Sequence, residues 1–427
     1  MGLVILLIFL FYIIYLDARY KSSVVPILLM TIISPEIKIG NIGIDSLYIF
    51  ECLLFLYICV TKKILIIGAV KRYTKIVVLC MSMYTMSWLF FSRMDFGSLI
   101  LCLTGGLKIL IVLVECWTLN FTFKNQIEND IFKLLTAVLI LNAAFITFQS
   151  LFYEPSLWLL KNVFLSSSEY EYALSATHAG HYTRYGGLFK YPMHLGVFCS
   201  IAIAFTLSIR RKVNRTVRYV VIVLGAYCGI MSSTKSFFIG AAVIYCFYAI
   251  QRCIAIKNKK DIFYSLIPLV AVILVVVFQN QIIQLIENVF GSYAAFYARK
   301  IVEFFNDTGS VLDTRLGEAG AIVSLREVVK ENFLFGVGPA SIQGEKIMDN
   351  AILVILHNGG LLALLTVLYY YLKTAKIFYE NKMSILVVIA IIACGIGFQI
   401  WIASPLTAWS CYYFDVEVNN LRRRKME

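Results

Sequence analysis

Three cationic side chains lie next to long apolar segments, where polar groups can meet water. Arg184 opens the stretch RYGGLFKYPMHLGVF, Lys235 lies in the short polar turn 232–236, and Arg315 falls at the start of the segment 313–332. A guanidinium group is planar, permanently charged and bidentate, so it suits a phosphate or diphosphate. We therefore expect these cations to line one anion-binding site.

Each cation also has a plainer alternative, which is a surface role. Arg184 can extend toward lipid headgroups, and Arg315 can pair with Asp313 or Glu318. Three other basic residues of the same region are expected to be surface charges: Arg299, Lys300 and Arg326. The anion-site hypothesis therefore depends on the convergence of Arg184, Lys235 and Arg315.

A carboxylate and an amide, Asp349 and Asn350, directly precede the apolar segment 351–364. Such a pair at the mouth of a membrane helix is costly unless it faces water or a substrate. Asp349 could orient or deprotonate a substrate hydroxyl. The alternative is that the pair only caps the helix, because Asp is a favoured N-cap residue. His357 lies two turns deeper, where it either contacts substrate or packs as a polar side chain.

Glycines stand beside several of these groups. Gly186 and Gly187 follow Arg184 and would let the backbone approach a ligand closely. Two further pairs are expected to permit close helix packing: Gly359 with Gly360, and Gly225 with Gly229 at GxxxG spacing.

The elements that must position these residues are membrane helices. Of the 427 residues, 60% are hydrophobic and only 15% are charged, and the mean hydropathy is +0.81. Apolar windows of about 20 residues, the length that crosses a bilayer, follow one another along the chain. They are continuous, so they predict helices and not barrel strands. We expect an all-α fold, a polytopic transmembrane bundle of about 11–13 spans, as one integral-membrane domain over 1–427.

The first apolar segment is predicted to be a retained helix, because it lacks a basic n-region and a small-residue cleavage site. The expected spans are roughly 2–16, 22–36, 44–61, 76–91, 98–119, 131–152, 188–209, 217–234, 236–251, 262–280, 350–373 and 384–403, with a short return over 406–414 after Pro405.

The net charge of +13 comes from short basic blocks between apolar segments. This pattern is typical of cytoplasmic loops and excludes a nucleic-acid partner. The blocks fall within 62–75, 210–218, 252–260, 373–382 and 422–425. Placing them inside sends the turn 232–236 to the outer side, together with a first extracytoplasmic loop, 153–187, and a large one, 281–349.

The large loop is expected to be partly helical. Its segment 313–332 has an amphipathic stripe, which would lie at the bilayer surface or cover a cavity. Loops of this length between spans usually carry function.

Several chemistries lack their motifs. The sequence has no Walker motif, no HExxH, no CxxC pair and no DxD-type acidic cluster, so we expect no cofactor and no metal. The 11 cysteines lie mostly in apolar segments without paired spacing, as expected of core residues. The energy for any reaction would come from an activated substrate or a gradient.

Four segments resemble the O-antigen ligase and polysaccharide polymerase superfamily and occur in its order over 184–364. The first, at 184–198, is similar to the family's R-x-x-G-x-F-x-x-P entry to a central helix. SSTKSFFIGAAV at 232–243 resembles its short polar turn, and 313–339 resembles its loop ending in L-F-G-x-G. DNAILVILHNGGLLAL at 349–364 is similar to its helix beginning [HD]-N-x-x-L.

Two positions depart from the family pattern. Ligases usually carry His where this chain has Asp349, and His357 does not fill that position, so the pattern favours a polymerase. The chain also lacks the proline that is common before Leu334, which affects a turn and leaves the chemistry untouched.

The resemblance implies a metal-independent glycosyltransferase at the outer face of the bacterial cytoplasmic membrane. Arg184 and Arg315 would bind the diphosphate of a polyprenyl-diphosphate-linked saccharide and stabilise the leaving group. Asp349 and Asn350 would position the acceptor, with Asp349 the candidate base. The expected partners are the lipid-linked saccharide, membrane lipid, a chain-length regulator and a flippase.

Two other functions stay open. A ligase of the same superfamily would transfer glycan to a different acceptor, and a transporter or flippase would move the lipid-linked saccharide across the membrane. Transporters usually show inverted repeats, broken helices and charges near the membrane midplane. Here the ionisable residues cluster in the expected outer loops, and the membrane midplane is expected to be almost free of them, which favours surface chemistry over translocation.

Overall fold

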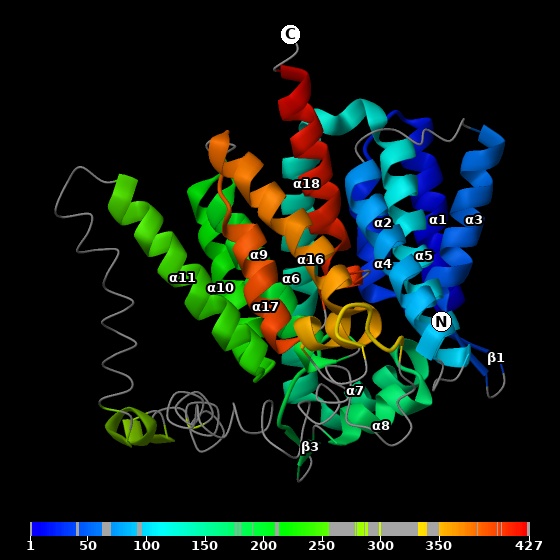
Figure 1. Ribbon diagram of the computed structural model, residues 1–427. Helices are drawn as coiled ribbons and strands as arrows, with labels where there is room; N and C mark the ends of the chain where they lie inside the picture. The colour runs from blue at the N-terminus through cyan, green and yellow to red at the C-terminus, as the bar shows by residue number, and fades with distance from the viewer. Residues whose placement is uncertain are drawn as a thin grey trace.

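The apolar segments of the sequence fold into a bundle of helices, seen in a computed structural model (Figure 1). It describes residues 2–39, 42–61, 70–91, 96–175, 177–178, 181–189, 191–209, 213–255, 332–339, 350–381, 383–398, 400–402 and 404–424, and a few residues between 278 and 299. The predicted helix 313–332 and the predicted span 262–280 lie outside the described residues, apart from their last residues.

The main helices of the first half are α1 (Gly2–Ala18), α2 (Val24–Ile33), α3 (Ser46–Thr61), α4 (Val70–Phe91), α5 (Phe96–Leu119) and α6 (Ile127–Leu151). Those of the second half are α9 (Pro192–Ser208), α10 (Arg215–Met231), α11 (Lys235–Ala255), α16 (Ala351–Glu380), α17 (Leu386–Gly397) and α18 (Pro405–Arg424). The fold is therefore mostly helical, as predicted.

Shorter elements fill the connections. They are η1 (Phe121–Gln126), α7 (Tyr153–Leu159), η2 (Leu160–Phe164), α8 (Ser167–Ser175) and the antiparallel hairpins β1 (Glu36–Ile39) with β2 (Ile42–Asp45) and β3 (Thr177–His178) with β4 (His181–Tyr182). In the first hairpin Glu36 pairs with Asp45, and in the second Thr177 pairs with Tyr182.

Three of the described helices are long and apolar enough to cross a membrane. They are Leu99–Leu119 within α5, Ile127–Leu151, which is α6, and Ala351–Glu380, which is α16. Other apolar helices are shorter, such as α2, which has 10 residues where the sequence predicted a span over 22–36. The larger number of spans stays a prediction.

The helix α9 is buried on every face, which is typical of a central helix. It packs against α10, α11 and α17, and also touches α6 and α18. Glycines allow this close packing, as predicted for Gly225 and Gly229. A Cβ on Gly225 would lie 3.0 Å from Ile203 of α9, and one on Gly229 would lie 2.1 Å from the ring of Phe237 of α11.

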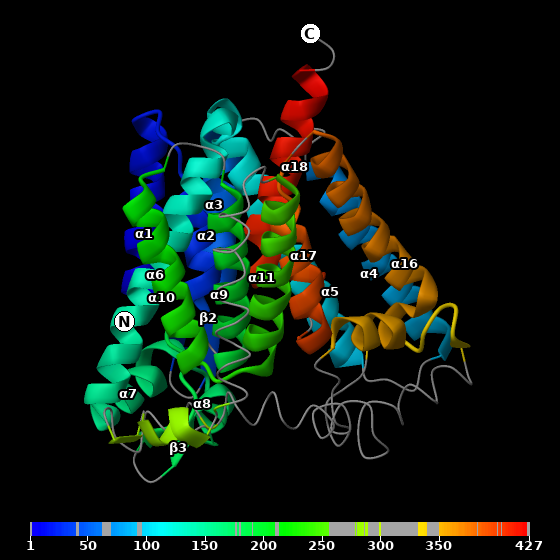
Figure 2. The same ribbon diagram turned by 90° about the vertical axis from the view of Figure 1, so that its left-hand side faces the viewer.

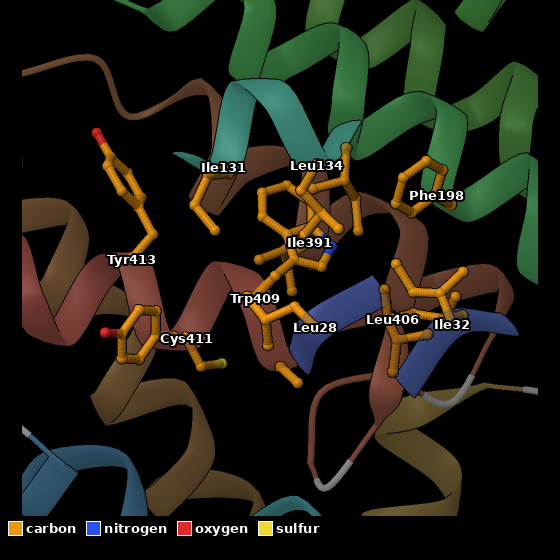
Figure 3. Packing of buried hydrophobic residues seen from close by; sticks show 14 of the residues in the cluster. Leu28, Ile32, Ile131, Leu134, Phe198, Ile391, Leu406, Trp409, Cys411 and Tyr413 are labelled. Carbon is orange, nitrogen blue, oxygen red and sulfur yellow. The ribbon is translucent and has the colours of Figure 1, made fainter. Parts of the chain in front are cut away.

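The prediction of a short return over 406–414 is wrong, because α18 is a 20-residue helix within the bundle. It packs against α2, α4, α5, α6, α9 and α16. Figure 3 shows Leu406, Trp409 and Cys411 of α18 among side chains of α2, α6, α9 and α17. The ring of Trp409 lies 5.9 Å from that of Phe205. Hydropathy missed this helix because it carries polar residues such as Ser410 and Asp415, which protein shields from lipid.

The two ends of the bundle differ in what they carry. One end, which we call the motif end, holds α7, α8, the β3–β4 hairpin, the α10–α11 turn and the first residues of α16 (Figures 1 and 2). The other end holds the start of α10 and the ends of α16 and α18, which are the basic segments of the sequence. The described parts of the segment 153–187 and the polar turn 232–236 thus share one end, opposite these basic segments.

Candidate functional site

Arg184 lies on a tight loop at the motif end, with its side chain exposed. The next residue anchors the loop, because the Tyr185 ring is fully buried and its N–H donates to the carbonyl oxygen of Met231 over 3.1 Å. This hydrogen bond joins the Arg184 loop to the end of α10. Anchored by Tyr185, the loop leaves the Arg184 guanidinium accessible to solvent or to an anionic substrate.

Gly187 lies very close to another part of the protein. Its φ of +61° is a left-handed conformation, and a Cβ there would lie 2.3 Å from Oδ1 of Asn142. Asn142 is buried in α6, accepts the Leu188 N–H at 2.9 Å and donates to Val138 O at 2.8 Å. A Cβ on Gly186 would likewise lie close to another atom, the carbonyl oxygen of Phe189, at 2.9 Å. Both glycines therefore shape the loop, and Asn142 is a positioning residue that sequence reasoning missed.

Aromatic rings continue from this loop across the motif end. Tyr172 of α8 lies 5.0 Å from Tyr191, which lies 5.1 Å from His194, which in turn lies 4.9 Å from Phe398. These contacts connect the loop before α9 with the residues that follow α17.

Tyr182 holds the β3–β4 hairpin against the bundle. Its hydroxyl lies 2.8 Å from Oγ of Ser156, and its ring lies 5.3 Å from that of Tyr185. Burial raises the pKa of Tyr182, while hydrogen bonds with Ser156 and Gln149 act in the opposite direction. We interpret Tyr182 as a neutral structural anchor.

Lys235 begins α11, directly after the turn of Ser232, Ser233 and Thr234. The turn is held by its own hydroxyls, since Oγ of Ser232 donates to Gly229 O at 2.6 Å and lies 3.0 Å from Oγ1 of Thr234. The Tyr185–Met231 hydrogen bond places this turn beside the Arg184 loop. The structure therefore brings the backbone of Lys235 toward Arg184, while the Lys235 side chain lies outside its description.

A second group of motif residues meets at a break in α16. Gly360 has a φ of 67° and a ψ of −166°, so α16 is two helices, and the first runs across the bundle end (Figure 2). The prediction that Gly359 and Gly360 permit helix packing therefore holds only for Gly359, where a Cβ would lie 2.7 Å from the Tyr84 ring of α4. At Gly360 the reason for glycine is the backbone conformation.

The segment 333–338 supplies backbone partners at this break. Val337 donates its N–H to the carbonyl oxygen of His357 at 2.8 Å. In return, Leu361 and Leu362 donate to the carbonyl oxygens of Phe333 and Leu334 at 2.9 and 3.3 Å. A broken helix is tolerated when such partners satisfy the freed backbone groups.

The same segment is fixed to α4. Oγ of Ser87 donates to the carbonyl oxygen of Phe335, and a Cβ on Gly338 would lie 3.0 Å from the backbone of Trp88. Gly336 and Gly338 both have positive φ, 74° and 90°, which explains the spacing of the glycines in FLFGVGP.

Asn350 caps the first part of α16, as the plainer alternative proposed. Its backbone is extended, and its Oδ1 accepts the Ile352 N–H at 2.8 Å. His357 is half-buried, and its Nδ1 lies 3.0 Å from Oδ1 of Asn358. Arg315 and Asp349 lie outside the described residues, so their proposed roles stay predictions.

The two groups, the Arg184–Lys235 group and the Gly360 group, are bridged by α17. This helix packs against α9 and α11 on one side and α16 on the other. The residues after it continue the bridge, because Phe398 meets His194 and Trp401 O accepts the Tyr371 hydroxyl of α16 at 2.9 Å. All four motif regions thus contribute described segments to the motif end.

Several ionisable side chains lie buried within the N-terminal helices, which the sequence did not predict. Glu51 of α3 and Glu115 of α5 are buried, and Lys108 pairs with Asp45 at 2.7 Å. These residues lay within predicted spans, so their presence was readable from the sequence, but their burial was not.

No family model, curated protein or solved structure matches this chain. The class that the fold itself defines is a mostly helical protein, and three helices of its described part are long and apolar enough to cross a membrane.

Proposed function

We propose that this chain is a polysaccharide polymerase that joins polyprenyl-diphosphate-linked oligosaccharide repeat units at the outer face of the bacterial cytoplasmic membrane. One observation carries the proposal. Segments that resemble the polymerase superfamily, far apart in sequence, gather at the motif end, opposite the described basic segments. By the positive-inside rule the basic end faces the cytoplasm, which turns the motif end outward.

The Arg184–Lys235 group would bind the diphosphate of the donor. Arg184 is exposed, and the start of α11 lies beside its loop. A helix N-terminus carries partial positive charge and free N–H groups, so it reinforces a cationic site for phosphate oxygens. This charge would stabilise the diphosphate as it leaves.

The reaction is a displacement at a sugar carbon. The hydroxyl oxygen of an incoming repeat unit would form a bond to the anomeric carbon of the growing chain. The bond from that carbon to the diphosphate oxygen would break, and polyprenyl diphosphate would leave with the bonding electrons. Asp349 is the candidate acceptor of the hydroxyl proton, and Arg315 is the second candidate contact with the diphosphate.

The test is polysaccharide length in a deletion strain complemented with wild type, Arg184→Ala, Arg315→Ala or Asp349→Ala. Arg215→Ala is the matched control, because Arg215 is exposed at the opposite end, 5.7 Å from the Tyr219 ring. We expect single repeat units from the three site variants and a full ladder from the control, at equal membrane levels. Full ladders from both arginine variants would overturn the proposal.

Two observations favour a second candidate, a transporter of lipid-linked saccharide. The helix break at Gly360 and the ionisable residues buried in α3 and α5 are both features of transporters. Purified protein in liposomes separates the candidates, because a polymerase converts lipid-linked units to a ladder and a transporter only moves them. A requirement for a second, non-identical acceptor would instead indicate a ligase.

A further inference from the structure

Two carboxyl groups lie buried inside the N-terminal helices. Glu51 of α3 is 3% exposed and Glu115 of α5 is 0% exposed. Within the described part of the chain, both oxygens of Glu115 and Oε1 of Glu51 have no hydrogen-bond partner. The two helices pack together, and the two carboxyls interact electrostatically.

The positive charge that acts on Glu51, Lys108, is already paired with another carboxylate. Nζ of Lys108 lies 2.7 Å from Oδ2 of Asp45 and 4.4 Å from the centre of the Tyr48 ring. The charge of Asp45 therefore opposes the effect of Lys108 on Glu51. Among the described residues, no ion pair or hydrogen bond joins either Lys108 or another cation to the buried oxygens of Glu51 and Glu115 that lack a partner.

The elements packed against α3 and α5 carry other titratable groups. Those with described side chains include Tyr12, Tyr15 and Asp17 of α1, Arg72, Lys75, Cys80 and Tyr84 of α4, and Asp415, Arg422 and several tyrosines of α18. Lys75 and Arg422 are exposed. Among these, Asp17 accepts the Tyr57 hydroxyl at 2.8 Å, and the Tyr412 hydroxyl donates to the carbonyl oxygen of Cys116 at 3.3 Å. Asp415 pairs with Arg72 of α4, so that cation is engaged as well.

Two ionised carboxylates in this position would be strongly unfavourable. An unpaired buried charge loses its hydration and gains nothing in return, and the second carboxylate adds repulsion. A protonated carboxyl, by contrast, can donate a hydrogen bond to the neighbouring oxygen. No group of three or more metal-binding side chains occurs among the described residues, which disfavours a divalent metal.

We propose that Glu51 and Glu115 form a binding site for a monovalent cation, a proton or Na⁺, within the N-terminal helices. The site is independent of the proposed polymerase activity. Asp45 and Lys108 connect it toward the motif end, since Asp45 ends the β1–β2 hairpin and its side chain is 20% exposed.

The first experiment is thermal unfolding of the purified full chain in nanodiscs as a function of pH, with choline chloride as the only salt. The folded protein would hold a proton that the unfolded chain has already released above the ordinary glutamate pKa of about 4. Stability would then fall as pH rises, and the unfolding constant would rise about tenfold per pH unit for each such proton. Glu51→Gln and Glu115→Gln keep the side-chain volume and should each weaken this dependence. Glu380→Gln is the matched control, because Glu380 is 51% exposed.

Comparing sodium with choline shows whether the bound cation is Na⁺ or a proton. If Na⁺ occupies the site, replacing choline by sodium restores the stability of the wild type at high pH and leaves Glu115→Gln unchanged. If a proton occupies it, sodium has no effect, and the infrared spectrum shows a protonated carboxyl band that Glu115→Gln removes. If a Gln variant does not fold, the infrared band and the sodium response of the wild type still test the proposed site. If the wild type shows neither the protonated carboxyl band nor the sodium response, the proposal of a cation site is wrong.

Discussion

The backbone N–H of Val337 donates to the carbonyl oxygen of His357 over 2.8 Å, which joins two segments that are separate in the sequence. The carbonyl belongs to the last turn before Gly360, where α16 breaks. The FLFGVGP segment and the HNGG segment therefore form one structural unit, in which each supplies hydrogen bonds that the other lacks.

Gly360→Ala tests this unit. The Gly360 conformation, φ 67° and ψ −166°, belongs to a region that is essentially restricted to glycine, and a Cβ would lie 2.3 Å from Leu334 O. We expect a loss of at least about 1–3 kcal/mol from backbone strain. The measurement is thermal unfolding of the purified variant in detergent.

Gly105→Ala is the control for this substitution. Gly105 lies inside α5, and a Cβ there would meet nothing within 4 Å. Alanine favours a helix over glycine by about 1 kcal/mol, so this variant should match or exceed the wild type. A Gly360→Ala protein as stable as Gly105→Ala would show that the α16 break is not fixed by glycine.

Asn142→Ala should loosen the Arg184 loop. The substitution leaves the Leu188 N–H without its acceptor, at a cost of about 1–3 kcal/mol. Because Arg184 would no longer be held in place, we expect shorter polymer as well as a lower unfolding temperature. Thr147→Ala is the control, since Thr147 is exposed on the same helix and bonds only weakly beyond it, at 3.4 Å to Tyr227. Normal polymer from Asn142→Ala would contradict a positioning role.

Arg184→Lys separates charge from geometry. Lysine keeps the positive charge but loses the planar fork that binds two phosphate oxygens. We expect polymer of intermediate length, between wild type and Arg184→Ala, measured by gel at equal membrane levels. Arg215→Lys at the opposite end should behave as wild type. If Arg184→Lys gave full-length polymer, the site would need only a positive charge.

The sequence predicted most helices but not what breaks or buries them. Apolar length located α5 and α6 well, because lipid or protein on all sides requires continuous apolar residues. It missed α18, whose Ser410 and Asp415 reduce hydropathy although the helix is buried among others. The break at Gly360 was also not predicted, because its backbone partners come from the separate segment 333–338.

For the candidate site, too, the sequence predicted some features and missed others. The sequence predicted Arg184 and Lys235 on the same side of the bundle, and the Tyr185–Met231 hydrogen bond brings their loops together. Asn142 could not be identified, because a single Asn within an apolar helix carries no signal of its partner. Likewise, the sequence shows Glu51 and Glu115 but not that their helices turn them toward each other.

Asp415 is predicted to brace the end of the bundle opposite the motif end. Its carboxylate accepts the Tyr73 N–H at 3.0 Å and the Tyr370 hydroxyl at 3.2 Å, and it lies 4.0 Å from the Arg72 guanidinium. It thereby connects α18 with α4 and α16. Asp415→Ala leaves Arg72 without its counter-charge, and removing one partner of a buried pair costs about 3–5 kcal/mol.

The double variant Arg72→Met with Asp415→Leu should be more stable than Asp415→Ala, because it removes both charges together and leaves neither unpaired. Thermal unfolding of Arg72→Met, Asp415→Leu and the double variant measures the coupling between the two side chains. The control pair is Lys376 with Glu380, which are exposed and 3.9 Å apart, so Glu380→Ala should cost no more than about 1 kcal/mol. Additive effects of the Arg72 and Asp415 substitutions would show that the two side chains stabilise the bundle independently, and that Asp415 acts through the Tyr73 and Tyr370 hydrogen bonds alone.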